Sequence, residues 1–219
     1  MNNITDFLAT WDDQYQTQIL KIPLFQERSS LNLYQQKKFA AVFYHLRGHF
    51  YRFLWYLAGR APDNRYKKIV LANISEEFGG QLDSHEELYW EFCKALNVNI
   101  SEEILNPKFN LKFTELFNQT HLEFILKENW PAAWAAFAAY ERLDNIDYAN
   151  LKNLALKFDL PAKALKFFEV HTKVTHFEKT EPLLSNLYLE NFDEVKKGFE
   201  FISKHQIQMW KNLSESVLS

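Results

Sequence analysis

The amino-acid sequence predicts an all-α protein, and three observations support this prediction. Only five glycines and six prolines occur among the 219 residues, and most of them stand where a helix could begin or end. No segment alternates apolar and polar residues between turn signals, as a half-buried strand would. Hydrophobic residues make up 47 % of the chain, which is enough to fill a core. We therefore expect one helical domain over residues 1–219.

Apolar residues recur at helical spacing in ten segments. In chain order, we expect helices at 4–20, 31–58, 63–78, 84–96, 111–127, 130–144, 148–157, 161–178, 182–190 and 193–216. The second segment contains FAAVFYHLRGHFYRFLWYLAG, the most apolar stretch of the chain, which histidine and arginine side chains interrupt. It is therefore expected to be a buried core helix.

Capping residues mark where several of these helices start. Asn129 precedes Pro131, and Asp159 precedes Pro161, which predicts a capped helix with a first-turn proline at both places. The last segment, FDEVKKGFEFISKHQIQMWKNL, is amphipathic. It is expected to pack over the bundle or to pair with a second copy of the chain, which would make a homodimer.

The composition also restricts the partners and the compartment. The net charge is only −3, and Lys and Arg are spread along the chain, which argues against nucleic acid as a partner. No stretch of about 18 apolar residues exists, so no membrane span is expected. Cys93 is the single cysteine, which excludes an internal disulfide and fits a reducing compartment. The first residues contain no basic segment followed by an apolar run, so we expect a cytoplasmic protein.

The stretch SEEFGGQLDSHEELYWEF places an acidic pair just before two glycines and a histidine just after them. In one continuous helix, Glu77 and His85 would lie about 80° apart around the axis and about 12 Å apart along it. Gly79 and Gly80 allow the chain to leave the helix, and Ser84 starts a new one, so both side chains could turn toward one point. The alternative is an ordinary helix–loop–helix with surface charges.

A second unusual carboxylate stands in NWPAAWAAFAAYERLDN. Positions 130–140 carry no charge, and a helix that is apolar on every side is usually buried. If Glu141 points inward at the end of this run, it needs a cation such as a metal ion or an arginine. Arg142 is next in sequence but points elsewhere on a helix. The alternative is that Glu141 marks where the helix reaches the surface.

The third segment is DLPAKALKFFEVHTKVTHFEKTEP. If it forms one helix, its apolar face continues through His171, Thr175 and Glu178, whereas His176 lies roughly 140° away from His171 and faces outward. The alternative is a hydrogen-bonded core histidine at His171 and a solvated Glu178. Together, the three segments supply the acids and imidazoles of a carboxylate–histidine metal site in a helical bundle.

These residues also resemble a known family, the haem-oxygenase-like metal oxidases and oxygenases, which share their fold with TenA and PqqC. The sequence is most similar to the branch of the chlamydial protein that associates with death domains. The branch pattern N-[LI]-x-[DE]-E, glycine, turn and H-x-x-L-[WY]-x-x-F corresponds here to Asn73, Ile74, Glu76, Glu77, Gly79, Gly80, His85, Leu88, Tyr89 and Phe92. A later helix that ends in Y-E corresponds to Tyr140 and Glu141. A further pattern, F-x-x-H-x-x-x-D-x-x-H, corresponds to Phe168 and His171, with Thr175 and Glu178 at the last two positions.

The resemblance implies a haem-oxygenase-like helical bundle with a central metal site. Members typically bind two irons and activate dioxygen for the oxidation of small organic substrates. If the ligand positions of the family apply to this chain, the metal ligands would be Glu77, His85, Glu141 and His171. Glu178 would replace the last histidine of the family pattern. Thr175 cannot replace the charge of the aspartate, which leaves two irons, one iron, manganese or a lost metal all open.

Three further residues concern the surroundings of this site. In the aromatic helix 31–58, Tyr44 and His45 are candidates to line a substrate pocket, and His45 with His49 one turn later is a weaker candidate for a metal pair. The expected function is therefore a non-haem iron oxidase or oxygenase that acts on a small molecule with dioxygen. The alternative is a non-catalytic relative that binds a small ligand or a protein and has a degenerate metal site.

Overall fold

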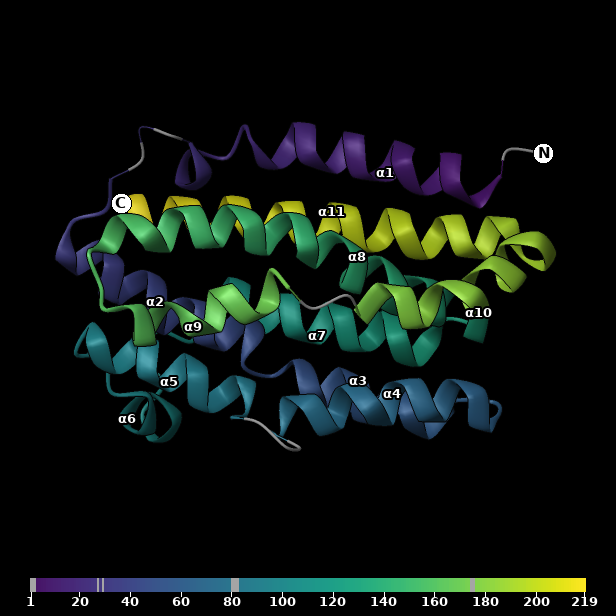
Figure 1. Ribbon diagram of the computed structural model, residues 1–219, viewed down its shortest axis with the longest axis horizontal. Helices are drawn as coiled ribbons and strands as arrows, with labels where there is room; N and C mark the ends of the chain where they lie inside the picture. Colours follow the sequence, from purple (N-terminus) through teal and green to yellow (C-terminus); the bar gives the residue numbers. More distant parts are fainter. Residues whose placement is uncertain (1–2, 27, 29, 80–82, 174–175) are drawn as a thin grey trace.

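The computed structural model is helical throughout the residues that it describes, which are 3–26, 28, 30–79, 83–173 and 176–219. The α-helices are α1 (Ile4–Ile19), α2 (Leu33–Arg47), α3 (Phe50–Arg60), α4 (Asn64–Glu77), α5 (His85–Ala95), α6 (Ile100–Leu105), α7 (Lys112–Lys127), α8 (Trp130–Ala155), α9 (Ala162–His171), α10 (His176–Glu190) and α11 (Phe192–Leu218). Two short 3₁₀ helices, η1 (Pro23–Phe25) and η2 (Leu156–Phe158), complete the described secondary structure. The predicted all-α class is confirmed (Figure 1).

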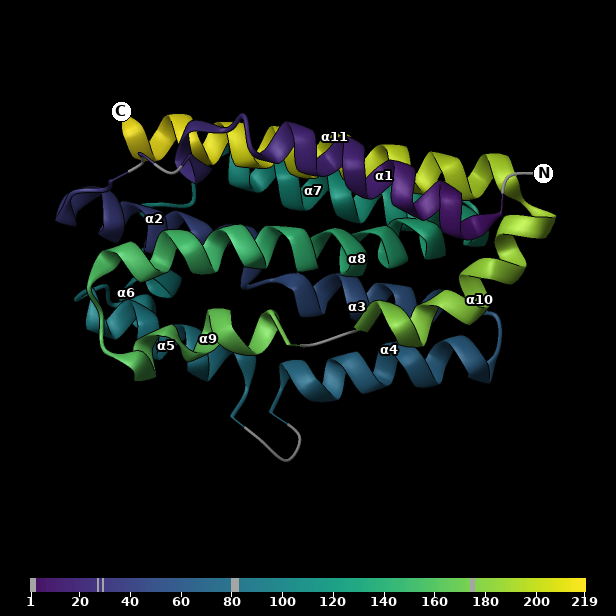
Figure 2. The ribbon, with the colours of Figure 1, turned by 45° about the horizontal axis from the view of Figure 1, so that its top comes forward.

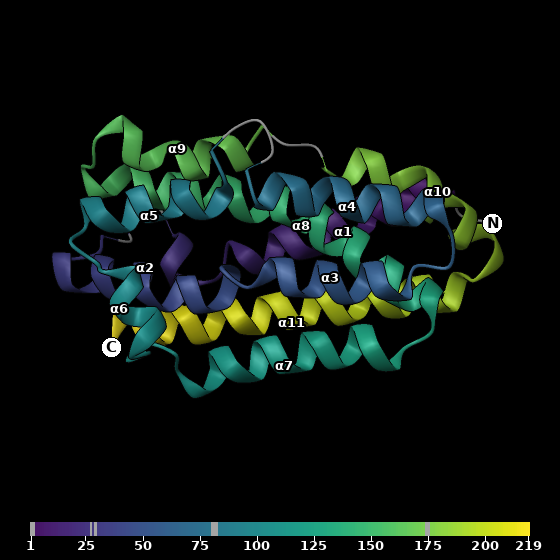
Figure 3. The same ribbon diagram turned by 90° about the horizontal axis from the view of Figure 1, so that it is seen from below.

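Helix α8 is the central helix of the bundle. It packs against α11, α10, α9 and α1 (Figure 2). Positions 132–139 of α8 are buried on every side, so the prediction that this apolar segment is a core helix is confirmed. Seen from below, α4 and α5 follow one another along one edge of the bundle, with α9 and α10 beside them (Figure 3). The end of α4 and the start of α5 therefore lie close to the end of α9 and the start of α10.

Small residues let α8 and α11 approach closely. A Cβ atom added to Gly198 of α11 would lie 2.6 Å from the backbone oxygen of Ala132 and 2.8 Å from the Cβ of Ala135. These distances are far shorter than van der Waals contact, and both neighbours belong to the buried face of α8. The position therefore requires glycine because of helix–helix packing rather than because of an unusual backbone angle.

Replacing Gly198 by alanine is expected to destabilise the protein by about 1–3 kcal/mol, since the added methyl group must push α8 and α11 apart. Gly59 is a matched control, because it is also helical and a Cβ there would meet no atom within 4 Å. Gly59→Ala should stabilise the protein by about 0.5–1 kcal/mol. Urea unfolding of both variants checks the two opposite signs, and equal effects would contradict the packing argument.

Several predicted helix boundaries are wrong. The segment 31–58 is two helices: α2 ends at Arg47 with Gly48 as its cap, and α3 begins only after His49. The segments 130–144 and 148–157 form one helix, α8. Segment 161–178 ends at His171, and α10 then continues through Pro182, where a break was expected. Helix α6 was not predicted at all.

Local capping signals were more reliable. Asn129 caps α8 by accepting a hydrogen bond from the backbone N–H of Ala132, and Pro131 lies in the first turn as expected. At α9, by contrast, Pro161 itself is the capping residue and Asp159 adopts a left-handed backbone conformation, with φ 53°. Cys93 is fully buried in α5, as expected for a packed core residue. No helix within the described ranges is both long enough and apolar enough to span a bilayer.

Candidate metal centre

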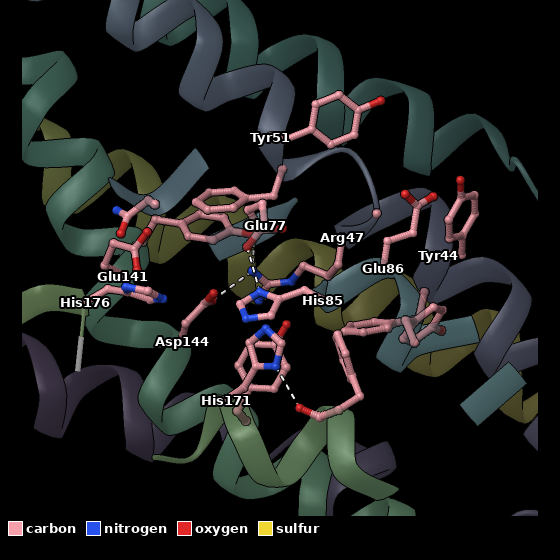
Figure 4. A pocket seen from close by; sticks show the side chains of 18 of the residues that line it. Tyr44, Arg47, Tyr51, Glu77, His85, Glu86, Glu141, Asp144, His171 and His176 are labelled. Carbon is pink, nitrogen blue, oxygen red and sulfur yellow. Dashed lines mark hydrogen bonds and ion pairs between the residues drawn. The ribbon is translucent and has the colours of Figure 1, made fainter. Parts of the chain in front are cut away.

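The site lies in a pocket between α8 and the two helix breaks (Figure 4). Glu77 is the last residue of α4 and His85 is the first residue of α5. The Oε1 atom of Glu77 lies 2.8 Å from Nδ1 of His85. Gly79 has a φ of 97°, which lets the chain leave α4, and a capping box between Ser84 and Glu87 starts α5. The sequence thus turns the carboxylate and the imidazole back toward each other.

The electrostatics of this pair favour the protonated form of His85. Burial alone would lower the pKa of His85, but the hydrogen bond to Glu77 and the charge of Glu77 raise it above its ordinary value. The side chains of His85 and Glu77 are 10 % and 21 % exposed. The pair therefore forms a mostly buried wall of the pocket.

Glu141 points into the same pocket from α8, so the inward orientation is the one observed. The residue is only 6 % exposed, and its Oε1 atom has no hydrogen-bond partner among the described residues. Burial raises the pKa of Glu141 well above its ordinary value, and the nearby carboxylates of Asp144 and Glu77 raise it further. An acid in this environment is stabilised by any cation that enters the pocket.

His171 ends α9 and faces the pocket beside His85, with the two ring centroids 4.3 Å apart. Its Nδ1 donates to the backbone carbonyl of Phe167 at 2.7 Å, which leaves the lone pair of Nε2 available. Its ring also stacks on Tyr148, with the centroids 4.1 Å apart. Burial lowers the pKa of His171 well below its ordinary value, and His85 lowers it further, so the neutral, metal-binding form is favoured.

The helical phase predicted beyond His171 is wrong, because α9 ends there. His176 starts α10 and lines the pocket instead of facing away from it. Its Nε2 lies 3.3 Å from a carboxylate oxygen of Glu76, and its buried Nδ1 has no partner in the described part of the chain. Glu178 is exposed and is not a pocket residue, so the structure does not place it as a ligand. Thr175 lies outside the described residues.

Aromatic side chains form the remaining walls. Nine of the residues that line the pocket are aromatic: Phe43, Tyr44, Phe50, Tyr51, Phe78, Tyr89, Tyr140, Tyr148 and Phe167. Tyr44 was expected here, and burial raises its pKa to about 12. His45, also expected, is not a lining residue, because it points toward α6, where its Nε2 lies 2.9 Å from Glu103. Glu103 is therefore the partner of this buried histidine. The alternative, in which His45 and His49 bind a metal ion together, is not needed to explain why His45 is buried.

Sequence reasoning missed an arginine and an aspartate that line the pocket. Arg47 ends α2, and its side chain is only 4 % exposed. It donates to the hydroxyl of Tyr140, to Asp144 at 2.8 Å and to Asp147 at 2.9 Å. Burial raises the pKa of Asp144 to about 6, although the charge of Arg47 opposes the shift. The spacing of Glu141 and Asp144, three residues apart on a buried helix, was the one signal that could have revealed the aspartate.

Across the described ranges, no three His, Cys, Asp or Glu side chains already surround a single point as the ligands of a metal ion would. Several of them instead have other partners: Glu77 pairs with His85, and Asp144 pairs with Arg47. The residues predicted as ligands at 77, 85, 141 and 171 nevertheless line one pocket, although they come from four different helices.

The sequence matches one protein-family model over most of its length. A family model described as iron-containing redox enzyme matches residues 37–177. None of the curated proteins matches the chain. The matched region contains the pocket residues from α2 to the start of α10, including Glu77, His85, Glu141 and His171.

Solved structures share the fold at low sequence identity. A CADD-like protein of unknown function from Nostoc punctiforme has a TM-score of 0.74 and 17 % identity, over 97 % of this chain and 96 % of that one. A domain of unknown function from Shewanella denitrificans, with a heme oxygenase-like fold, has a TM-score of 0.77 and 18 % identity, over 98 % and 93 % of the two chains. The predicted haem-oxygenase-like fold and the predicted resemblance are thus confirmed. Because the family model spans well over half of its length, the chain belongs to the iron-containing redox enzyme family.

Proposed function

We propose that this pocket binds iron and that the protein is a non-haem oxidoreductase that uses dioxygen to oxidise a small organic substrate. The observation that carries the proposal is the buried Glu141, whose Oε1 has no partner in the described residues while three imidazoles and two further glutamates line the same pocket. A carboxylate in such a place is stabilised by a cation, and mixed carboxylate–imidazole donors suit Fe(II). Family membership supports the same metal.

The residues present fit iron by their chemistry. Glu77 and Glu141 would supply carboxylate oxygens, and His85, His171 and His176 would supply imidazole nitrogens. The hydrogen bond from Nδ1 of His171 to the Phe167 carbonyl already fixes the tautomer that a metal-binding Nε2 requires. Mn(II) prefers similar oxygen-rich donors and is the second metal to test.

The other pocket residues would bind and orient the substrate. Bound iron would supply the one-electron chemistry that dioxygen requires. The aromatic walls exclude water and offer flat apolar surfaces to a small organic molecule. Arg47 holds the hydroxyl of Tyr140 at the edge of the pocket, which fixes that ring next to Phe50, with the two centroids 4.5 Å apart. These groups position the substrate, and they do not need to move during turnover.

Anaerobic loading with Fe(II), followed by desalting and elemental analysis, tests the proposal. We expect at least one tightly bound iron per chain, because Oε1 of Glu141 has no hydrogen-bond partner among the described residues and a bound cation would neutralise its charge. Exposure to air should then oxidise this iron and consume dioxygen in proportion to the iron bound. A chain that keeps neither iron nor manganese after loading would instead be a non-catalytic binding module, and bound iron that is inert to dioxygen would contradict the oxidase activity.

A further inference from the structure

Asp144 lies on α8 one helical turn after Glu141, and both residues line the pocket. Residues three apart on a helix project from the same face, so the two carboxylates enter the pocket from one wall. Figure 4 shows Asp144, Glu141 and His176 on the same side of the pocket in that view. No pattern in the sequence assigns Asp144 to a metal site.

The two oxygens of Asp144 have different surroundings. Oδ1 accepts a hydrogen bond from Nη1 of Arg47 at 2.8 Å and a longer one, at 3.4 Å, from Nε2 of Gln206. Oδ2 takes part in neither contact. The side chain is 19 % exposed, whereas that of Asp147, which binds the same arginine, is fully buried. Arg47 and Gln206 thus fix the carboxylate by one oxygen and leave the other for the pocket.

Two other side chains that line the pocket each have one polar atom without a partner among the described residues. The Oε1 atom of Glu141, a residue that is more than nine-tenths buried, and the Nδ1 atom of His176 are both buried without a hydrogen bond among the described residues. A wall of the pocket therefore presents an oxygen of Glu141, an oxygen of Asp144 and a nitrogen of His176. Carboxylate oxygens and imidazole nitrogens together are donors that suit Fe(II), as in the familiar set of two histidines and one carboxylate with the remaining positions open.

We infer that Asp144 is a metal-ligating residue of this chain, which binds the cation through Oδ2 while Arg47 holds Oδ1. This inference rests on the proposed function, because it assumes that the pocket takes a metal ion. Arg47 is then a positioning residue, which orients a ligand as outer partners of metal ligands do.

Cobalt(II) titration of the purified full chain tests the inference, because Co(II) replaces Fe(II) in air and its visible absorption reports on its ligands. Asp144→Asn is expected to weaken the apparent Co(II) affinity at least about tenfold and to change the absorption bands. Asp147→Asn is the matched control, since it removes the same charge beside the same arginine but from a residue that does not line the pocket. It should bind Co(II) within about threefold of the wild type, with the same bands.

The outcomes separate this inference from the proposed function. If the wild type binds Co(II) and Asp144→Asn binds it equally well with unchanged bands, the assignment of Asp144 is wrong while the metal pocket stands. Equal weakening by Asp147→Asn would also overturn it, because the effect would then come from charge alone. A wild type that binds no Co(II) contradicts both. Asp144→Ser, which also removes the carboxylate, gives the same test if Asp144→Asn fails to fold, as judged by near-UV circular dichroism.

Discussion

Replacing Glu141 by glutamine is expected to abolish tight iron binding while making the metal-free protein more stable. The amide keeps the size and shape of the side chain but cannot supply an anionic oxygen, so the apparent iron affinity should fall at least about a hundredfold. In the metal-free protein, the same change removes a carboxylate whose pKa burial already raises well above its ordinary value. A neutral group is less costly there, so the free energy of unfolding at pH 7 should rise.

The prediction is specific because the iron affinity should fall while the free energy of unfolding of the metal-free protein should rise. Equilibrium dialysis against Fe(II) without oxygen measures the first effect, and urea unfolding in the presence of EDTA measures the second. Glu86→Gln is the matched control, because Glu86 also lines the pocket but is exposed. It should change neither quantity by much. If Glu141→Gln retains iron like the wild type, or if it destabilises the metal-free protein, then Glu141 is not the buried anion on which the metal site depends.

Local sequence signals were sufficient to predict half of the site. The glycines after Glu77, the capping box at Ser84 and the charge-free run before Glu141 are each encoded within a few residues. Local interactions decide these features in the structure, so the expected turn between Glu77 and His85 and the inward position of Glu141 are both observed. Periodicity predicts orientation well as long as the element that carries it is continuous.

The other half of the site depended on a helix that does not continue. The prediction that His171 and Glu178 share one face assumed a single continuous helix. In the structure α9 and α10 are separate helices, so His176 lines the pocket and Glu178 is exposed, which is the reverse of the prediction. A change of phase at such a break cannot be read from residue spacing. The break is also hard to foresee, because no glycine or proline lies between residues 171 and 176.

Contacts between distant segments could not be predicted from the sequence for a different reason. Arg47 is separated from Asp147 by 100 positions, and Tyr15 is separated from Asp147 by 132. No local pattern requires these residues to meet, and Arg47 was interpreted only as an interruption of an apolar helix. Buried polar groups of this kind are specified by the whole fold, because each is stable only when all of its partners are present.

Replacing Arg47 by methionine is expected to destabilise the protein by about 3–5 kcal/mol at pH 7, the usual cost of removing one partner from a buried ion pair. Asp147 is fully buried and Asp144 is partly buried, and both would lose their cation. The Tyr15 hydroxyl donates to Asp147 at 2.7 Å, which compensates only part of that charge. Arg142→Met is the matched control: Arg142 binds Asp12 at 2.7 Å, but the two side chains are 25 % and 30 % exposed, so its loss should cost about 1 kcal/mol or less.

The pH dependence of the Arg47→Met variant distinguishes lost charge pairing from lost packing. Burial raises the pKa of Asp144 to about 6 and that of Asp147 to about 7 even with Arg47 present, and without its charge both values should rise further. An acid whose pKa is higher in the folded state than in the unfolded state binds more protons when folded, so its stability decreases as the pH rises through the folded-state pKa. The deficit of the variant relative to the wild type should therefore be smaller at pH 5 than at pH 8. A deficit that is equal at both pH values would mean that Arg47 stabilises the bundle by packing against Tyr140 and Trp210 rather than by neutralising the two aspartates.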